Sequence, residues 1–345
     1  MGAKAVLFAL PVLLALLAGV AVQMLDWSIQ PDPSAGRVAG ASPPRKVAVL
    51  GASGATGHEL LRNLVKTATD RRNPITSIVL LVRDFSSLKQ CKQFPPHMKK
   101  PPSFELFTCV AIDFERLTAD PTGAQAAALR SALAGVGVLF SAFGTTRALA
   151  GSDEAFARVD HDYLLAVARA AKEAGVPHLS AVSSTGADAA ASSVYLSTKG
   201  RAEASLRQLG LARLSLFRPS LLLTGTVHQR PDARLGEDVS KLLAVPLSRW
   251  LPPNLRPVSA YFLAQSMLVS AGWAAEDGAV DVFENSGIHA IGNRFFKDFG
   301  GSESKYAGGA CGWGCAGAID DHDNGEAQRE VNKLTKGSDR TQGKK

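Results

Sequence analysis

The chain of 345 residues is long enough for one large or two ordinary domains, and its 46% hydrophobic and 20% charged residues are typical of a globular protein rather than a disordered one. The net charge of +7 is concentrated in residues 37–103, which carry twelve Lys or Arg and three acidic residues. Such a region can attract an anionic cofactor, a lipid surface or nucleic acid. No zinc finger, RNA-binding aromatic motif or long basic helix accompanies it, so nucleic acid is not expected as a partner.

The first twenty-five residues predict a membrane segment. Residues 5–25 contain one polar side chain, Gln23, and their length is close to the roughly 20 residues that span a bilayer. A cleaved signal peptide is the alternative, although its apolar core usually has about 7–15 residues. We favour an uncleaved anchor in the endoplasmic reticulum or secretory pathway, or in the mitochondrial outer membrane. Residues 26–44, rich in Pro, Ser, Ala and Gly, predict a linker.

From residue 45 to 293 apolar strands alternate with helices, which predicts one α/β domain with a doubly wound parallel sheet, a Rossmann architecture. The expected strands are 47–50, 77–82, 107–112, 136–143, 179–183 and 213–217, and the expected helices include 124–134, 160–174 and 258–274. Residues 86–103 carry four lysines and four prolines and predict an exposed insertion. Residues 294–345 are Gly-rich and poor in apolar side chains, which predicts a flexible tail.

The four cysteines fit neither a disulfide framework nor a zinc site, so we expect no metal. They are Cys91, Cys109, Cys311 and Cys315, and the last two are separated by three residues without a histidine cluster beside them. Free thiols in the tail are the favoured interpretation.

A glycine-rich turn follows the first predicted strand. Gly51, Gly54 and Gly57 recur at every third position between the strand and an amphipathic helix. A strand, a glycine turn and a helix N-terminus aim unpaired backbone N–H groups at one point, which suits a pyrophosphate. The spacing indicates the short-chain dehydrogenase branch of dinucleotide-binding folds, and an ordinary glycine-rich loop is the alternative.

A tyrosine and a lysine follow the fifth predicted strand. Tyr195 and Lys199 are four residues apart, so on a helix they lie on one face, about one turn from each other. The ammonium group favours the phenolate form of the tyrosine, which can then exchange a proton with a substrate hydroxyl while hydride moves to or from a nicotinamide. Ser183 or Ser184, at the end of that strand, can hydrogen-bond the substrate oxygen.

Charged residues follow three other strands. Arg83 ends the second strand, where an arginine can pair with a 2′-phosphate, which favours NADP(H) over NAD(H). Asp84 beside it is of the type that accepts from a free ribose hydroxyl, and an exposed surface pair is the alternative for both. Asp113 after the third strand could face the adenine or simply end the strand. Arg147, after the fourth, is a candidate anion or substrate contact.

Several runs between residues 46 and 293 resemble the Tat-interactive-protein-like group of atypical short-chain dehydrogenases. They are Gly51–Gly57, Phe143–Arg147, Arg158–Tyr163, Ser183–Asp188, Tyr195–Gly200, Phe217–Pro219, Arg234–Glu237 and Glu284–Gly292. The resemblance implies that Tyr195 is the proton donor or acceptor. It also implies that NADP(H) is bound through Ser53, Gly54, Ala55, Thr56, Arg83, Phe143, Gly144, Tyr195, Lys199, Leu222 and Arg234. This sequence has Asp84 where relatives carry a second arginine, and Ala55 where an acidic residue is common.

These observations predict a membrane-tethered, NADP(H)-dependent oxidoreductase that acts on a carbonyl or hydroxyl group of a small-molecule substrate. The resemblance leaves a second hypothesis, an NADPH-binding regulatory protein with protein partners and little turnover, because some members of the group act as regulators. A membrane-anchored scaffold with a vestigial fold is a third.

Overall fold

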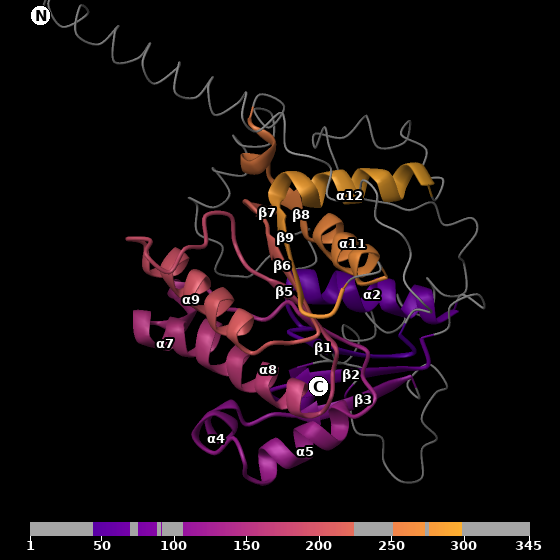
Figure 1. Ribbon diagram of the computed structural model, residues 1–345, viewed down its shortest axis with the longest axis vertical. Helices are drawn as coiled ribbons and strands as arrows, with labels where there is room; N and C mark the ends of the chain where they lie inside the picture. Colours follow the sequence, from indigo (N-terminus) through magenta and orange to yellow (C-terminus); the bar gives the residue numbers. More distant parts are fainter. Residues whose placement is uncertain are drawn as a thin grey trace, which may run out of the picture.

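The computed structural model describes residues 44–69, 75–87, 91, 106–223, 251–272 and 276–298. A seven-stranded sheet runs through the centre, with helices on both faces (Figure 1). All neighbouring strands in it are parallel. In spatial order they are β3 (Phe107–Ala111), β2 (Ser77–Val82), β1 (Lys46–Leu50), β4 (Val138–Ser141), β5 (His178–Val182), β6 (Arg213–Arg218) and β9 (Ala279–Glu284). The first six follow the order of the dinucleotide-binding Rossmann fold, so the predicted α/β class is confirmed.

All six predicted strands are present, within two residues of the expected ends. They were recognisable because strands covered on both faces read as continuous apolar runs, and four of the five residues of β1 are buried. Strand β9 was not predicted. It contains a charged residue, Asp281, whose buried carboxylate pairs with Arg213 of the neighbouring strand at 3.1 Å. An acidic residue within a short segment breaks the apolar run on which the strand predictions depended.

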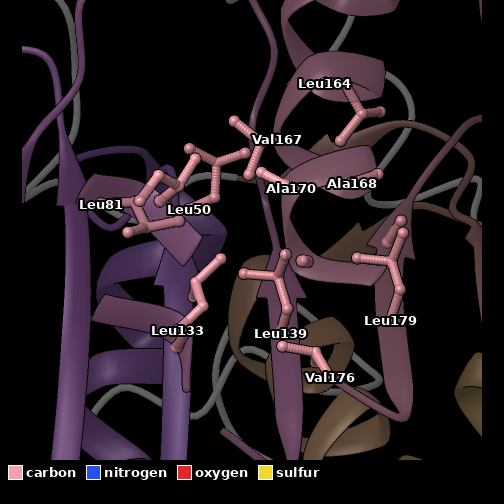
Figure 2. Packing of buried hydrophobic residues seen from close by; sticks show 14 of the residues in the cluster. Leu50, Leu81, Leu133, Leu139, Leu164, Val167, Ala168, Ala170, Val176 and Leu179 are labelled. Atoms are coloured by element: carbon pink, nitrogen blue, oxygen red, sulfur yellow. The ribbon is translucent and has the colours of Figure 1, made fainter. Parts of the chain in front are cut away.

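Each face of the sheet has its own core. On one face lie α5 (Ala124–Leu133), α8 (Leu164–Glu173) and α9 (Val194–Gln208), and on the other α2 (Ala55–Thr69), α11 (Ala260–Ala271) and α12 (Asn285–Asp298). Figure 2 shows part of the first core, where Leu50 and Leu139 of the sheet pack with Val167 of α8. Helix α12 continues to Asp298, past the domain boundary expected at residue 293.

The helix expected over residues 160–174 begins earlier and has an irregular turn. It starts with α7 (Asp153–Ala157), where Ser152 accepts the N–H of Ala155, and continues through a π-helical turn, η3 (Arg158–Tyr163), into α8. The remaining short elements are η1 (Phe85–Ser87), α4 (Phe114–Ala119), α6 (Arg147–Ala150), η6 (Pro253–Leu255) and the parallel pair β7 (Leu222–Leu223) and β8 (Val258–Ser259). The π turn places one extra residue in the helix between α7 and α8.

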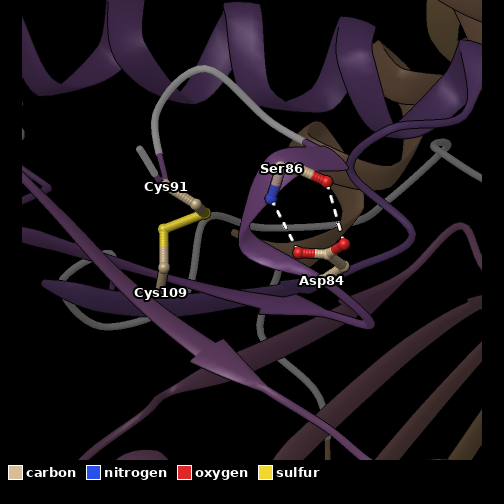
Figure 3. Close-up of a disulfide and its surroundings, with 4 residues drawn as sticks. All are labelled: Asp84, Ser86, Cys91 and Cys109. Atoms are coloured by element: carbon tan, nitrogen blue, oxygen red, sulfur yellow. Dashed lines mark hydrogen bonds between the residues drawn. A yellow bond between two sulfur atoms is a disulfide. The ribbon is translucent and has the colours of Figure 1, made fainter. Parts of the chain in front are cut away.

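Cys91 and Cys109 form a disulfide (Figure 3). The prediction that the cysteines form no disulfide was therefore wrong for this pair. Strand pairing explains it, because Cys109 of β3 lies opposite Leu80 of β2, the strand that leads into the segment with Cys91. Cys91 is also buried, so this part of the predicted 86–103 insertion is not exposed. Cys311 and Cys315 lie outside the described residues.

Within the part of the chain that the structure describes, no helix combines the length and the apolar character needed to cross a membrane. The segment predicted to do so, residues 5–25, lies outside that part, as do most of the predicted linker and nearly all of the tail.

Candidate functional site

The strand register brings four loops to one edge of the sheet. Leu50, the last residue of β1, pairs with Leu81 of β2 on one side and with Ser141, the last residue of β4, on the other. Ser141 in turn pairs with Ala181 of β5. The loops after these four strands therefore leave the sheet at its carboxyl edge, where open parallel sheets bind their ligands.

The turn after β1 leaves no room for side chains at two of its glycines. Gly51 has a φ of +86°, and a Cβ on it would lie 2.6 Å from the carbonyl oxygen of Ala142. A Cβ on Gly57 would overlap the carbonyl oxygen of Gly51. Gly54 donates its N–H to that carbonyl at 3.0 Å. Since α2 begins at the next residue, the N–H groups of its first turn lie at this loop, as an anion site requires. The other predicted contacts here are Ser53, which is exposed, Ala55, which is half-buried, and Thr56, which is buried.

The two charged residues after β2 differ in their surroundings. Asp84 accepts hydrogen bonds from the backbone N–H and the hydroxyl of Ser86, each at 2.9 Å (Figure 3). These bonds, the backbone one first, lower the pKa of the Asp84 carboxyl. Arg83 is exposed, and none of the described residues forms an ion pair with it. The guanidinium is available to an anionic ligand, whereas the carboxylate is engaged by its own turn.

Asp113, which follows β3, caps a helix. Its carboxylate accepts the backbone N–H of Arg116 at 3.0 Å and pairs with the guanidinium of that residue at 3.2 Å, at the start of α4. Asp113 therefore has a structural role as the N-cap of α4, and its contact with adenine stays a prediction.

The loop after β4 joins the glycine turn to helix α9. Its Phe143 packs on the ring of Phe114, with the ring centroids 5.1 Å apart. A Cβ on Gly144 would lie 2.9 Å from Oδ1 of Asp160 and 3.4 Å from Nζ of Lys199. Since the residue before Phe143 touches Gly51, this loop contacts the glycine turn on one side and the lysine of the predicted Tyr–Lys pair on the other.

Arg147, expected as an anion or substrate contact, is paired within the chain. Its guanidinium donates to Oδ2 of Asp153 at 3.0 Å, at the first residue of α7. The positive charge at this position is therefore balanced by a neighbouring carboxylate.

Tyr195 and Lys199 lie one turn apart on α9, as their spacing predicts. Tyr195 is 40% exposed, and its ring packs beside that of Phe156 with centroids 5.6 Å apart. Lys199 is buried, and its Nζ lies 2.7 Å from Oδ1 of Asp160, whose side chain is fully buried. Asp160 was not selected from the sequence, although it lies in the Arg158–Tyr163 run. An acidic residue in the middle of a helix that packs on the core is the signal that could have identified it.

The two candidate serines after β5 have different partners. The hydroxyl of Ser183 is buried and donates to Oε1 of Glu203 at 2.6 Å. Arg218 donates to both oxygens of that carboxylate, at 2.9 and 2.6 Å, and to Glu284 at 2.8 Å. The hydrogen bonds to Glu203 are the main cause of a raised pKa of Arg218. The half-buried Ser184 has one long bond, 3.4 Å, to the carbonyl oxygen of the next residue, so its hydroxyl is the one that can readily change partner.

Of the remaining predicted cofactor contacts, Leu222 lies in β7, half-buried and paired with Val258 of β8. Arg234 lies outside the described residues. The structure thus brings the glycine turn, Phe143, Gly144 and Lys199 together, with Tyr195 on the next turn of the same helix.

Comparisons with known proteins find relatives in sequence and similar solved structures. No protein-family model matches the chain. Protein HTATIP2 of Rattus norvegicus is 31% identical over 249 residues, which cover 72% of this chain and 89% of that protein. Protein fmp52, mitochondrial, of Emericella nidulans is 31% identical over 204 residues, covering 59% and 76%. Among solved structures, NADPH-dependent quinone oxidoreductase QOR2 of Escherichia coli complexed with NADPH is 18% identical with a TM-score of 0.44, covering 69% of this chain and 68% of that one. The dTDP-glucose 4,6-dehydratase DesIV of Streptomyces venezuelae with NAD and TYD bound is 16% identical with a TM-score of 0.47, covering 75% and 82%.

Proposed function

The chain belongs to the family of protein HTATIP2, and we propose that it is an NADP(H)-dependent oxidoreductase of the short-chain dehydrogenase type. Its substrate is a small molecule with a carbonyl or hydroxyl group. The observation that carries the proposal is the position of the loop after β4. Gly51 abuts the start of this loop at Ala142, and Lys199 reaches it at Gly144. A phosphate-binding turn and a Tyr–Lys pair thus meet at one loop.

The residues at this edge fit a dinucleotide. The backbone at Gly51 and Gly57 is too close to its neighbours for any side chain, while a Cβ on Gly54 would find its nearest atom at 3.4 Å. Such a turn lets the pyrophosphate approach the backbone and the N-terminus of α2. The loop at Phe143 and Gly144 then leads from this turn to the helix with Tyr195 and Lys199.

In the reaction we propose, bound NADP(H) supplies or accepts a hydride. Tyr195 gives a proton to the carbonyl oxygen of the substrate, or takes it from the hydroxyl in the reverse direction. Its exposed position on the first turn of α9 leaves the phenol open to a substrate. Lys199 places a positive charge one helical turn from Tyr195. The hydroxyl of Ser184 donates a hydrogen bond to the substrate oxygen.

We propose NADP(H) rather than NAD(H) because of the two residues after β2. Each oxygen of Asp84 already accepts a hydrogen bond from Ser86, which leaves the carboxylate fewer acceptor sites for a free ribose hydroxyl. Arg83 is exposed and unpaired among the described residues, so it can pair with a 2′-phosphate. Arg83→Ala should weaken NADPH binding by about tenfold or more and leave NADH binding within about twofold, measured by calorimetry. Equal losses for both cofactors would remove the basis of this preference.

The test of the oxidoreductase uses the full-length protein in detergent and a panel of carbonyl compounds, with NADPH oxidation followed by absorbance. Tyr195→Phe should bind NADPH as the parent does and lose turnover by about 10²–10⁴-fold. Tyr261→Phe, on α11 across the sheet, is the matched control and should retain both properties. A Tyr195→Phe protein as active as its parent would show that the proton comes from elsewhere.

A second function, an NADPH-binding regulatory protein with protein partners and little turnover, is favoured by one specific observation. Two of the expected catalytic groups already have partners within the chain. Lys199 forms an ion pair with Asp160, and the hydroxyl of Ser183 donates a hydrogen bond to Glu203. NADPH binding without turnover across the panel, together with partner capture that requires NADPH, would favour this function over the first.

We propose that residues 5–25 tether the chain to a membrane and that the folded domain lies in an oxidising compartment. The Cys91–Cys109 disulfide supports the second part, because disulfides persist in secretory compartments and are rare where thiols are kept reduced. This favours the endoplasmic reticulum or secretory pathway over the cytosolic face of the mitochondrial outer membrane, although the fungal relative carries the word mitochondrial in its name. Carbonate extraction of membranes tests the tether. Protease protection of a tagged domain tests the compartment.

A further inference from the structure

The carboxylate of Asp160 lies where the loop after β4 meets helix α9, and each of its oxygens has a different partner. Oδ1 lies 2.7 Å from Nζ of Lys199. Oδ2 accepts the backbone N–H of Thr145 at 2.8 Å. The side chain has no exposed surface, and that of Lys199 is 8% exposed. One buried carboxylate therefore joins the lysine of the Tyr–Lys pair to the loop that borders the glycine turn.

Asp160 lies within the π turn over Arg158–Tyr163. In such a turn the backbone accommodates one extra residue, and turns of this kind occur frequently at functional sites. Asp160 is the third residue of the turn, and Asp162, two residues later, is half-exposed and pairs with His161 at 2.7 Å. Two aspartates on the same turn thus have different surroundings, one within the site and one at the surface.

The contacts of Gly144 show how closely these groups pack. A Cβ on Gly144 would lie 2.9 Å from Oδ1 of Asp160 and 3.4 Å from Nζ of Lys199. The loop backbone, the carboxylate and the ammonium are in mutual contact, so a displacement of any one of them displaces the others. A buried ion pair is weak evidence for stability, because burying the two charges costs about as much as their attraction returns.

We propose that Asp160 is a positioning residue that fixes Lys199 against the Gly144–Thr145 backbone and thereby forms the nicotinamide half of the cofactor site. The adenosine half, built on the glycine turn and Arg83, does not depend on it. This inference rests on the proposed function, since it assumes that a nicotinamide nucleotide spans the two halves.

The test compares two probes on full-length protein in detergent, NADPH and adenosine 2′,5′-bisphosphate, which lacks the nicotinamide half. Asp160→Asn keeps the size of the side chain and removes its charge, so Lys199 loses its counter-ion. We expect calorimetry to show NADPH binding weakened by about tenfold or more and bisphosphate binding within about twofold of the parent. Asp162→Asn is the matched control on the same turn and should bind both probes as the parent does. A general loss of structure would weaken both probes alike.

A double-variant cycle tests whether Asp160 acts through the lysine. Asp160→Asn should weaken NADPH binding less in a Lys199→Met background than in the parent, because the ion pair is already broken there. If Asp160→Asn does not fold, Asp160→Glu, which keeps the charge and moves it by one methylene, should show the same split between the probes.

Three results would overturn the inference while leaving the proposed function intact. The first is unchanged NADPH binding by Asp160→Asn, and the second is an equal loss for both probes in a folded variant. Losses that simply add in the double variant would also overturn it, since the residue would then act independently of Lys199. A parent protein that binds neither probe would instead refute the proposed function, and this inference with it.

Discussion

Removal of the Cys91–Cys109 disulfide has an effect on stability that can be worked out from the structure. The bond joins residues 18 positions apart, and closing a loop of this size in the unfolded chain corresponds to about 3 kcal/mol. We therefore expect Cys91→Ala/Cys109→Ala to unfold more easily by about 3 kcal/mol. In a folded region of this size that corresponds to a Tm lower by roughly 6–12 °C.

The assay is thermal unfolding of the full-length protein with and without dithiothreitol. The reductant should lower the Tm of the parent by about as much as the double substitution does, and it should have no further effect on the double variant. Cys311→Ala/Cys315→Ala is the matched control, because the sequence predicts free thiols there, and it should retain the Tm of the parent.

The reasoning is refuted if dithiothreitol leaves the parent Tm unchanged. It is equally refuted if mass spectrometry of the non-reduced protein finds Cys91 and Cys109 alkylated. Either result would also withdraw the support that the disulfide gives to an oxidising compartment.

Four further variants test the site and the core. Gly57→Ala should abolish NADPH binding measured by calorimetry, since its methyl group would displace the glycine turn, and retained binding would show that the turn is not the phosphate site. Ser183→Ala should lower stability by about 1–3 kcal/mol in denaturant unfolding, because the buried carboxylate of Glu203 loses one of its hydrogen-bond donors, while Ser184→Ala should lower turnover more than stability; the opposite pattern would contradict the assignment. Burial, aided by a nearby arginine, lowers the pKa of His178 to about 3, so the fold holds this imidazole neutral. The contribution of His178 to stability should be complete above pH 6.5, the pKa of a histidine in the unfolded chain, and should fall by up to ~1.4 kcal/mol per pH unit below it. His178→Gln should reduce this dependence of the unfolding free energy on pH in thermal unfolding. An unchanged dependence would exclude the histidine as its source.

The fold and the glycine turn could be predicted because local patterns determine them. Parallel strands buried on both faces are apolar throughout, so β1 and β2 were evident from composition alone. A side chain at position 51 or 57 would clash with backbone atoms of the turn or of the residues after β4, so both positions need glycine. The spacing of the glycines in the sequence reflects this steric requirement. Tyr195 and Lys199 could be paired because helical geometry places residues four apart on one face.

The partners of the catalytic candidates could not be predicted, because they come from distant parts of the chain. Asp160 meets Lys199 across 39 positions of sequence, and Glu203 meets Ser183 across 20. Neither contact leaves a local pattern, since each depends on which helices the sheet brings together. The disulfide was missed for the same reason, as only the pairing of β2 with β3 places Cys109 beside the segment that contains Cys91.

Helix α9 shows how these long-range contacts divide the candidate site into an exposed part, where we propose the reaction takes place, and a buried supporting part. Tyr195, Lys199 and Glu203 follow one another at successive turns on one face, and the exposed fraction of the whole residue falls from 40% to 6% and 4% along the helix. The tyrosine has a ring neighbour in Phe156 and an exposed position, whereas the lysine is held by Asp160 and the glutamate by Ser183 and Arg218. Chemistry with an external substrate can therefore take place at the first turn, while the next two turns fix the helix to the sheet edge. A protein of this family that had lost turnover but kept its cofactor would be expected to change at the first turn and to retain the other two.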